Sequence, residues 1–177
     1  MQKMNRQTHE KQMVYGCVFC LTGKEASVAE KIELNFPDIR ALALRQKKRK
    51  TKNGKTTIES IVLFPGYVFF KTEEGNFVFE LTRIDGVLSV LSTPKGDWRL
   101  WGQDEEFTAW VFRNHGLIDF SKAYQEGDHI RILSGPLKDY EGEIIKIDKR
   151  NRNGQVALCF SGKTMKVWMG FELVDSI

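Results

Sequence analysis

The chain has little of several features that would assign a protein to a common class. Its 177 residues include only three cysteines, three histidines and four prolines. No apolar run approaches the roughly 18 residues that a membrane-spanning helix requires, and the first residues, MQKMNRQTHEKQ, lack the apolar segment of a signal peptide. We therefore expect a cytoplasmic protein that makes no membrane contact, with a disordered start over residues 1–12.

The cysteines do not predict a metal or redox site. Cys17 and Cys20 have the C-x-x-C spacing, but residues three apart on a strand point to opposite faces of a sheet. No second cysteine pair and no nearby histidine completes a ligand set, so we expect reduced cysteines in the core and no metal. The sequence also lacks a nucleophile with its base and a glycine-rich phosphate loop. We expect no cofactor and no enzymatic activity.

The composition allows one medium domain or two small ones. The 27 lysines and arginines exceed the 23 aspartates and glutamates, which gives a net charge of +4. This excess is too mild to separate a nucleic-acid binder from any other protein. The position of the charges along the chain is more informative than their total.

The stretch at 127–147, GDHIRILSGPLKDYEGEIIKI, alternates between apolar and polar residues on both sides of a loop rich in glycine and proline. This pattern predicts two half-buried strands, at 129–133 and 142–147, joined by a tight loop. We expect hairpin turns at Asn153-Gly154, the strongest signal in this half, and at Ser161-Gly162. The remaining strands, at 155–160, 164–169 and 173–174, would complete a five-stranded barrel.

The first half predicts a sheet with helices. Thr22 precedes Glu25 by three residues, which is the spacing of a capping box at the start of a helix. A second amphipathic helix is expected from Gln103 to His115, and the unpatterned segment 116–125 is expected to be a linker. The other predicted elements are strands at 13–21, 39–46, 56–62, 67–72 and 87–91 and a short helix at 76–82. A turn at Asn53-Gly54 is expected to join the strands at 39–46 and 56–62 into a long hairpin.

The run Leu63–Phe70, LFPGYVFF, is interrupted by Pro65-Gly66, which forces a bulge or turn within an apolar strand. Three motifs follow one another in the order seen in the NusG family of transcription elongation factors. They are the strand that leads into the capped helix near residue 22, the LFPGYVFF run, and the two strands joined by the glycine- and proline-containing loop near residue 135. Over residues 13–177 the chain resembles that family. The resemblance implies an α+β fold, with an NGN-type α/β sandwich (an antiparallel sheet flanked by helices) at 13–115, a linker at 116–125 and a small five-stranded KOW β-barrel at 126–177.

In this family an apolar depression grips the clamp helices of RNA polymerase. The resemblance assigns the polymerase contact to four aromatic or rigid residues: Tyr15, Phe64, Pro65 and Tyr67. Ordinary core packing is the alternative, because periodicity alone would place these residues in the core. The family more often has tryptophan where this chain has Tyr15, which would change the shape of the depression.

The segment 45–55 carries seven positive charges and no acid. It is interpreted either as a soluble, mobile hairpin tip or as a surface that attracts phosphates. In the family this hairpin points toward nucleic acid in the polymerase cleft, which favours phosphate contacts that position the protein without reading sequence. The residues expected near nucleic acid are Arg45, Lys47, Lys48, Arg49, Lys50, Lys52 and Lys55.

Basic residues also flank the strands of the KOW-like module, where a solvated surface is the alternative interpretation. Housekeeping members of the family usually present a phenylalanine near the Ser161-Gly162 turn to dock a ribosomal protein or the Rho terminator, whereas here Ser161 occupies that place and Phe160 is expected to face inward. This departure favours a specialised paralogue, most similar to the LoaP group of antiterminators that recognise an RNA hairpin. The residues expected to bind RNA are Lys138, Lys149, Arg150, Arg152, Lys163 and Lys166.

The predicted function is therefore that of a monomeric transcription factor that binds RNA polymerase and promotes processive elongation and antitermination, as an operon-specific paralogue recruited by a hairpin in the nascent RNA. Two alternatives stay open. One is a housekeeping elongation factor that couples to Rho or to the ribosome through a ribosomal protein. The other is a ribosome-associated protein that binds RNA through the KOW module alone.

Overall fold

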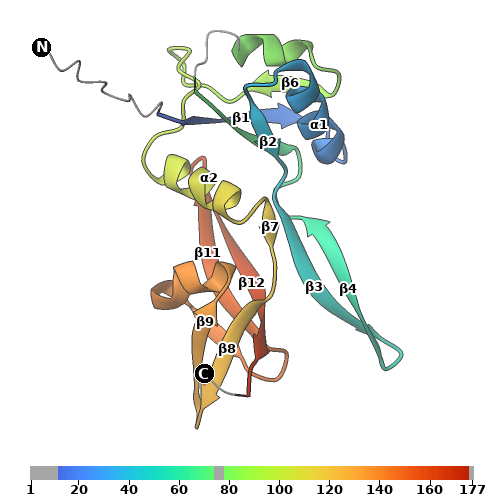
Figure 1. Ribbon diagram of the computed structural model, residues 1–177, viewed down its shortest axis with the longest axis vertical. Helices are drawn as coiled ribbons and strands as arrows, with labels where there is room; N and C mark the ends of the chain where they lie inside the picture. The colour runs from blue at the N-terminus through green and yellow to red at the C-terminus, as the bar shows by residue number, and fades with distance from the viewer. Residues whose placement is uncertain (1–11, 74–77, 176–177) are drawn as a thin grey trace, which may run out of the picture.

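The computed structural model describes residues 12–73 and 78–175, which form an amino-terminal lobe, a carboxy-terminal lobe and a long hairpin that extends from the first lobe toward the second (Figure 1). The predicted α+β class is confirmed. Apart from Gln12, the expected disordered start lies outside the described residues. None of the helices within these ranges has the length and apolarity that crossing a membrane demands.

The amino-terminal lobe contains a four-stranded antiparallel sheet with the order β2-β5-β1-β6. Its apolar residues alternate between two faces, as a strand period of two requires. Val68 and Phe70 lie in the cluster beside the first helix, whereas Phe69 lies in the cluster beside the second. The elements of this sheet and the first helix are β1 (Val14–Cys20), α1 (Glu25–Asn35), β2 (Arg40–Leu42), β5 (Tyr67–Thr72) and β6 (Val87–Val90).

The second helix, α2 (Gln103–Arg113), buries Phe107, Trp110 and Val111. The sequence predicted a helix as far as His115, but the helix ends at Arg113 and the chain then turns through left-handed His115 and Gly116, with φ of 54° and 69°. A short helix was expected at 76–82. The structure has a 3₁₀ turn, η1 (Val78–Arg83), and residues 76–77 lie outside the described part of the chain.

The basic hairpin consists of β3 (Arg45–Lys52) and β4 (Lys55–Val62), which pair along their whole length. Asn53 and Gly54 have φ of 52° and 75°, which are the left-handed values that a two-residue type I′ turn needs. The predicted turn is therefore confirmed. The single strand predicted at 39–46 is instead divided between β2 and β3, so that the chain leaves the sheet before it enters the hairpin.

The segment 116–125 was expected to be a linker without regular structure, but it contains two strands. β7 (Leu117–Ile118) pairs in parallel with the base of β3, and β8 (Ser121–Glu126) pairs in parallel with the last strand of the chain. Its alternating residues Ser121 and Ala123 are buried. The connection between the lobes is therefore held to both of them by backbone hydrogen bonds.

The carboxy-terminal lobe is the expected five-stranded curved sheet, with the order β10-β11-β12-β8-β9. One long strand replaces the two predicted at 164–169 and 173–174, because the pairing continues through Gly170. A 3₁₀ turn, η2 (Pro136–Glu143), occupies the connection after β9 and shortens the strand predicted at 142–147. The strands are β9 (His129–Ser134), β10 (Lys146–Asp148), β11 (Asn153–Phe160) and β12 (Lys163–Leu173).

The turn predicted at Asn153-Gly154 is wrong. These residues begin β11 and pair with Asp148 and Ile147. The turn consists of the four preceding residues, 149–152, of which Arg152 has the left-handed φ of 54°. Gly154 is needed for packing, because a Cβ at this position would lie 2.9 Å from Leu137 Cδ2. The turn at Ser161-Gly162 is confirmed, with φ of 51° and 72°.

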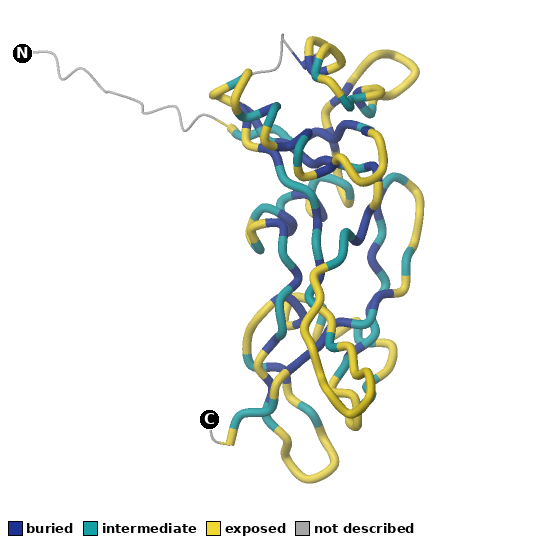
Figure 2. The backbone as a smooth tube through the Cα atoms, turned by 90° about the vertical axis from the view of Figure 1, so that its right-hand side faces the viewer, coloured by how far each residue is buried: buried dark blue, intermediate teal, exposed yellow. Residues whose placement is uncertain are grey.

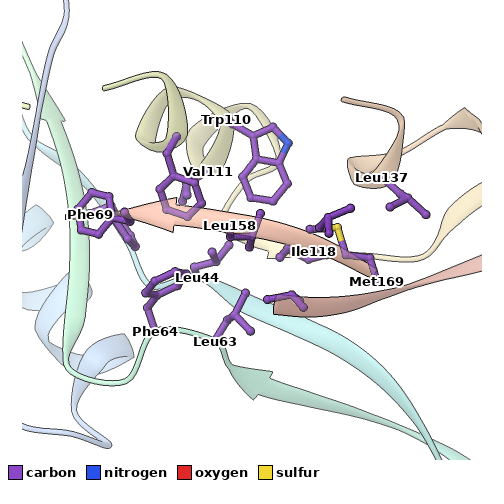
Figure 3. Packing of buried hydrophobic residues seen from close by; sticks show 14 of the residues in the cluster. Leu44, Leu63, Phe64, Phe69, Trp110, Val111, Ile118, Leu137, Leu158 and Met169 are labelled. Carbon is purple, nitrogen blue, oxygen red and sulfur yellow. The ribbon is translucent and has the colours of Figure 1, made fainter. Parts of the chain in front are cut away.

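The two lobes share one hydrophobic core. A single cluster of buried side chains includes Phe64, Phe69 and Phe107 of the amino-terminal lobe together with Leu158 and Phe160 of the carboxy-terminal lobe. Figure 2 shows buried segments running through the middle of the molecule, whereas the hairpin is exposed along most of its length. Figure 3 shows strand β11 between side chains of both lobes. A second cluster fills the space between α1 and the first sheet.

Candidate functional site

The turn at 64–67 leads into β5 and is fixed by a buried carboxylate. Gly66 has the left-handed φ of 83°. Its amide donates a hydrogen bond of 2.7 Å to Glu25 Oε1, and the Gly23 amide donates to both carboxylate oxygens at 3.0 Å. The Gly66 carbonyl in turn accepts from the Cys20 amide at 2.8 Å. One side chain at the start of α1 thus holds the turn against the end of β1.

Sequence reasoning missed this role of Glu25. It predicted a capping box with Thr22, but α1 begins at Glu25 and its cap, Lys24, makes no side-chain hydrogen bond. Glu25 is only 2% exposed. Burial acts to raise the pKa of its carboxyl, but hydrogen bonds from Gly66 and Gly23 and the charge of Arg45 outweigh that effect and hold the pKa below its ordinary value. Glu25 is therefore a buried anion that organises the turn.

The aromatic residues at this turn pack against the carboxy-terminal lobe. The ring of Phe160, at the end of β11, lies 4.9 Å from Phe69, 5.5 Å from Phe107, 5.9 Å from Tyr67 and 6.2 Å from Phe64, measured between ring centroids. Three of these contacts are edge-to-face, which is a favourable arrangement for aromatic pairs. Phe160 was expected to face inward in its own barrel, and it is indeed buried, but it also fills the junction with the other lobe.

Polar contacts surround this aromatic junction. Asp104 Oδ1, in the first turn of α2, accepts a hydrogen bond of 2.9 Å from the backbone amide of Ser161. Lys163 Nζ donates to the Tyr67 hydroxyl at 3.3 Å. Further along α2, the Trp110 and Tyr140 rings meet edge-to-face with 5.3 Å between centroids. The turn between β11 and β12 is therefore docked on the amino-terminal lobe.

The structure separates the four residues assigned to a polymerase contact. Phe64 and Tyr67 lie together, with ring centroids 6.0 Å apart. Pro65 is exposed between them. Tyr15 lies toward the other end of β1, where it pairs with Lys71 and its ring lies 6.0 Å from that of Phe112. Phe64 is buried and Tyr67 is half-buried. Both rings contact Phe160 of the carboxy-terminal lobe, which therefore covers this part of the candidate surface in the present arrangement.

The seven cations of the basic hairpin divide into two groups. Four make contacts: Arg45 donates to the Ser60 side chain and carbonyl, Lys47 pairs with Asp119 at 2.7 Å, Lys50 pairs with Glu59 at 2.9 Å, and Arg49 reaches the carboxy-terminal lobe. Within the described part of the chain, the other three make no ion pair and are exposed. They are Lys48, Lys52 and Lys55.

Arg49 joins the hairpin to the carboxy-terminal lobe. Its guanidinium lies 4.0 Å from the centroid of the Phe120 ring and donates to the Phe171 carbonyl at 3.2 Å and to Glu172 Oε1 at 3.4 Å. Nearby, Gln46 Nε2 donates to the Trp168 carbonyl at 2.6 Å. The hairpin is thus anchored along β12. Arg49 holds the two lobes together in addition to adding positive charge to the hairpin.

The cations expected to bind RNA do not form one patch. Lys149, Arg150 and Arg152 lie in the exposed turn between β10 and β11, where Lys149 comes within 3.6 Å of Asp128. Lys138 pairs with Glu141 in η2, and Lys163 faces Tyr67 at the other end of β11. Lys166 is exposed on β12. Only the first three lie in one loop.

The two closely spaced cysteines lie on opposite faces of β1, as predicted. Cys17 belongs to the core shared by the lobes and Cys20 to the core beneath α1. Burial raises the pKa of the Cys17 thiol well above its ordinary value and raises that of Cys20 to about 11. No group of three or more histidine, cysteine or acidic side chains within the described ranges is arranged to hold a metal ion.

Comparison with known proteins agrees with this architecture. Residues 14–103 match the family model described as "Transcription termination factor nusG", and residues 126–158 match the KOW motif. The "Transcription termination/antitermination protein NusG" of Borreliella burgdorferi is 27% identical over 143 residues, which cover 75% of this chain and 77% of that protein. The protein of the same name from Thermus thermophilus is 25% identical over 134 residues, covering 70% and 72%.

A solved structure described as "Domain interaction in Thermotoga maritima NusG" has the same fold, with a TM-score of 0.55 and 20% identity over 90% of this chain and 94% of that one. The family model covers the sheet, the hairpin and the Phe64–Tyr67 turn, and the motif match covers the start of the curved sheet. The chain belongs to the NusG family of transcription termination and antitermination factors.

Proposed function

We propose that the chain binds RNA polymerase through Phe64, Pro65 and Tyr67, with Tyr15 at the edge of the same lobe, and acts as an operon-specific antitermination factor recruited by an RNA hairpin. The observation that supports this most is the position of Phe160. In the docked arrangement this ring covers Phe64 and Tyr67, so the polymerase contact is available only when the lobes separate. A factor with a covered contact is suited to act at selected operons.

The β11–β12 turn supports a specialised role over a housekeeping one. The chain presents Ser161 at this turn, and its backbone amide is bound to Asp104. The neighbouring Phe160 is buried between the lobes. In the docked arrangement, no exposed aromatic side chain therefore stands at this turn to dock a ribosomal protein or Rho.

The recruiting RNA contact is assigned to the exposed turn between β10 and β11. Arg150 and Arg152 project there without an ion pair in the described part of the chain. Arginine can pair with base edges that a bulge or loop exposes, whereas lysine mainly meets phosphates. The basic hairpin supplies further phosphate contacts through Lys48, Lys52 and Lys55.

Two substitutions with opposite expected effects test the polymerase contact. Tyr67→Ala removes an interface aromatic, whose truncation commonly costs about 2 kcal/mol or more, so binding to core RNA polymerase should weaken more than about tenfold. Phe160→Leu keeps an apolar side chain in the core but loses the ring contacts that cover Tyr67. Because apparent affinity scales with the open fraction, this variant should bind polymerase at least about threefold more tightly.

The control is Tyr124→Ala, which truncates a half-buried tyrosine of β8 in the other lobe. Affinity is measured with purified core polymerase by interferometry, after circular dichroism shows that each variant is folded. A folded Tyr67→Ala protein that binds like Tyr124→Ala contradicts the polymerase contact. A Phe160→Leu protein that binds more weakly than wild type contradicts the covered-site model.

A further inference from the structure

A groove lies between the basic hairpin of the amino-terminal lobe and the β10–β11 turn of the carboxy-terminal lobe. It consists of two adjoining hollows of ≈380 and ≈400 Å³ that share Arg49, Asn151 and Asn153. Residues from both lobes line each hollow, so the groove exists only when the lobes are docked. The anchors of the docked arrangement at this point are Arg49 on Phe120 and the bond between Gln46 and the Trp168 carbonyl.

The volume of the two hollows indicates what kind of ligand fits the groove. Pockets for small molecules begin at about 300 Å³, so each hollow has room for a nucleotide. A double helix does not enter such a hollow, because each of its steps contains two paired nucleotides with their backbones, which need more space than one nucleotide. The groove therefore suits unpaired nucleotides and not a base-paired stem.

The charge of the lining is strongly positive. Five cations line the two hollows against a single acid, Asp148. The carboxylate of Asp148 is already occupied, because it accepts hydrogen bonds from the backbone and side-chain nitrogens of Asn151 at 2.9 and 2.8 Å. The five cations are Lys47, Lys48, Arg49, Arg150 and Arg152.

Three of these cations are free to meet a ligand. Lys47 and Arg49 are paired with Asp119 and Glu172. Lys48 on one side and Arg150 and Arg152 on the other are exposed and make no ion pair among the residues that the structure describes. A phosphate between the two sides would be neutralised by cations of both lobes.

The groove also contains an aromatic side chain. Trp168, on β12, is half-buried and lines the hollow that Lys47 and Lys48 share with Asp148. Aromatic side chains provide stacking surfaces for bases that are not paired in a helix. Cations beside an aromatic ring are the combination by which single-stranded nucleic acid is bound.

We propose that this groove binds the unpaired loop nucleotides of an RNA hairpin, with phosphates between Lys48 and the two arginines and one base stacked on Trp168. The proposal rests on the RNA contact assigned above to the carboxy-terminal lobe and adds the amino-terminal hairpin as a second wall. A ligand that touches both lobes binds the docked arrangement more tightly than the separated one. By linkage, RNA in this groove and polymerase at Tyr67 compete, because Phe160 covers Tyr67 while the lobes are docked. The groove therefore brings the chain to the transcript, and the RNA leaves it when the lobes separate and Tyr67 binds polymerase.

The test measures binding of the full chain to a fluorescent RNA hairpin with about ten base pairs and a loop of about six nucleotides. Lys48→Ala and Arg150→Ala should each weaken binding at least about threefold. Each should also reduce the slope of log K against log salt concentration by about 1, and the double variant should reduce it by about 2. The matched control is Lys95→Ala, an exposed lysine of the amino-terminal lobe outside the groove, which should change neither.

The aromatic contact is tested separately. Trp168→Ala should weaken binding at least about fivefold, whereas Trp168→Phe should retain most of the affinity, because stacking is worth about 1–3 kcal/mol per base. Urea unfolding shows whether the alanine variant is folded. If it is not, Trp168→Phe is compared with wild type by the fluorescence quenching that RNA produces, which should be smaller in the phenylalanine variant.

The outcomes distinguish this proposal from the proposed function. If Lys48→Ala binds like Lys95→Ala while Arg150→Ala is weakened, the carboxy-terminal lobe binds RNA alone and the shared groove is refuted. If a blunt RNA duplex or a DNA hairpin of the same sequence binds equally well, the assignment to unpaired RNA is refuted. If the unchanged chain binds no hairpin, the RNA contact itself is refuted, whereas the polymerase contact is judged by its own assay.

Discussion

Replacing Glu25 should disturb the turn that carries Phe64 and Tyr67. The carboxylate accepts hydrogen bonds from the Gly66 and Gly23 amides and is almost completely buried. Hydrogen bonds to charged groups contribute about 1.5–3 kcal/mol, and a buried donor left without a partner costs about 1–3 kcal/mol. Glu25→Ala should therefore lower the free energy of unfolding by about 2–4 kcal/mol. Glu25→Gln keeps an acceptor for Gly66 and should lose about 1–2 kcal/mol.

The effect should depend on pH in a defined direction. The pKa of Glu25 is lower in the folded chain than in the unfolded chain. Its stabilising contribution is therefore complete above the unfolded pKa, near 4.5, and is lost as the pH falls through the lower folded value. The stability difference between wild type and Glu25→Gln should therefore be constant near pH 7. It should shrink as the pH falls below the unfolded pKa of about 4.5.

Urea unfolding followed by tryptophan fluorescence measures these differences. Other carboxyls with lowered pKa values, such as Asp119 and Glu141, titrate equally in both proteins and cancel in the comparison. Glu30→Gln is the matched control, since Glu30 is an exposed residue of the same helix. If Glu25→Gln is as stable as Glu30→Gln, or if its deficit does not change with pH, the buried carboxylate does not organise the turn.

Three further predictions concern the rest of the chain. Gly154→Ala should lower the free energy of unfolding by about 1–3 kcal/mol, because the added Cβ would lie 2.9 Å from a side-chain atom of buried Leu137. Gly142→Ala, which has open space around it, should be neutral. Equal midpoints of urea unfolding for the two variants would contradict the packing argument. At pH 8 a thiol reagent should label half-buried Cys159 well before Cys17 and Cys20, because the raised pKa values of these two buried thiols lower their thiolate fraction. Peptide mass spectrometry measures the order of labelling, and early labelling of Cys17 would contradict its burial. NMR should show strand chemical shifts over 153–173 both in the full chain and in an isolated fragment 117–177, because β11 and β12 pair along eight residues. Helical shifts in either sample would refute the prediction that this lobe is stably β.

Most of the fold could be predicted because local patterns and tertiary structure agree. The apolar and aromatic run after Pro65-Gly66 and the Asn53-Gly54 dipeptide lead to the observed strand β5 and hairpin turn. The errors occur where a tertiary contact overrides a local signal. Asn153-Gly154 resembles a turn in sequence, but the small glycine is required beneath Leu137, so the turn moves to the preceding residues.

The candidate site was less predictable, because its key contacts join residues far apart in the chain. Glu25 and Gly66 are 41 positions apart, and Gln46 and Trp168 are 122 apart. Nothing in the sequence near Glu25 distinguishes a carboxylate that binds a distant turn from one that caps its own helix. Phe160 likewise follows the inward period of β11, and only its place at the end of the strand brings it to the other lobe.

If Phe64 and Tyr67 bind polymerase as proposed, the stability of the docked lobes determines how far a signal that separates them can raise the affinity for polymerase. Phe160 makes four aromatic contacts across the junction, and such pairs contribute about 0.5–1.5 kcal/mol each beyond area burial. Docking that is favoured by about 3 kcal/mol would leave roughly one chain in 150 open, and apparent polymerase affinity would fall by the same factor. Opening the lobes would restore it without any change in the contact surface. Under the proposed function, the aromatic turn supplies the surface that binds polymerase, and the stability of the junction determines how often that surface is available.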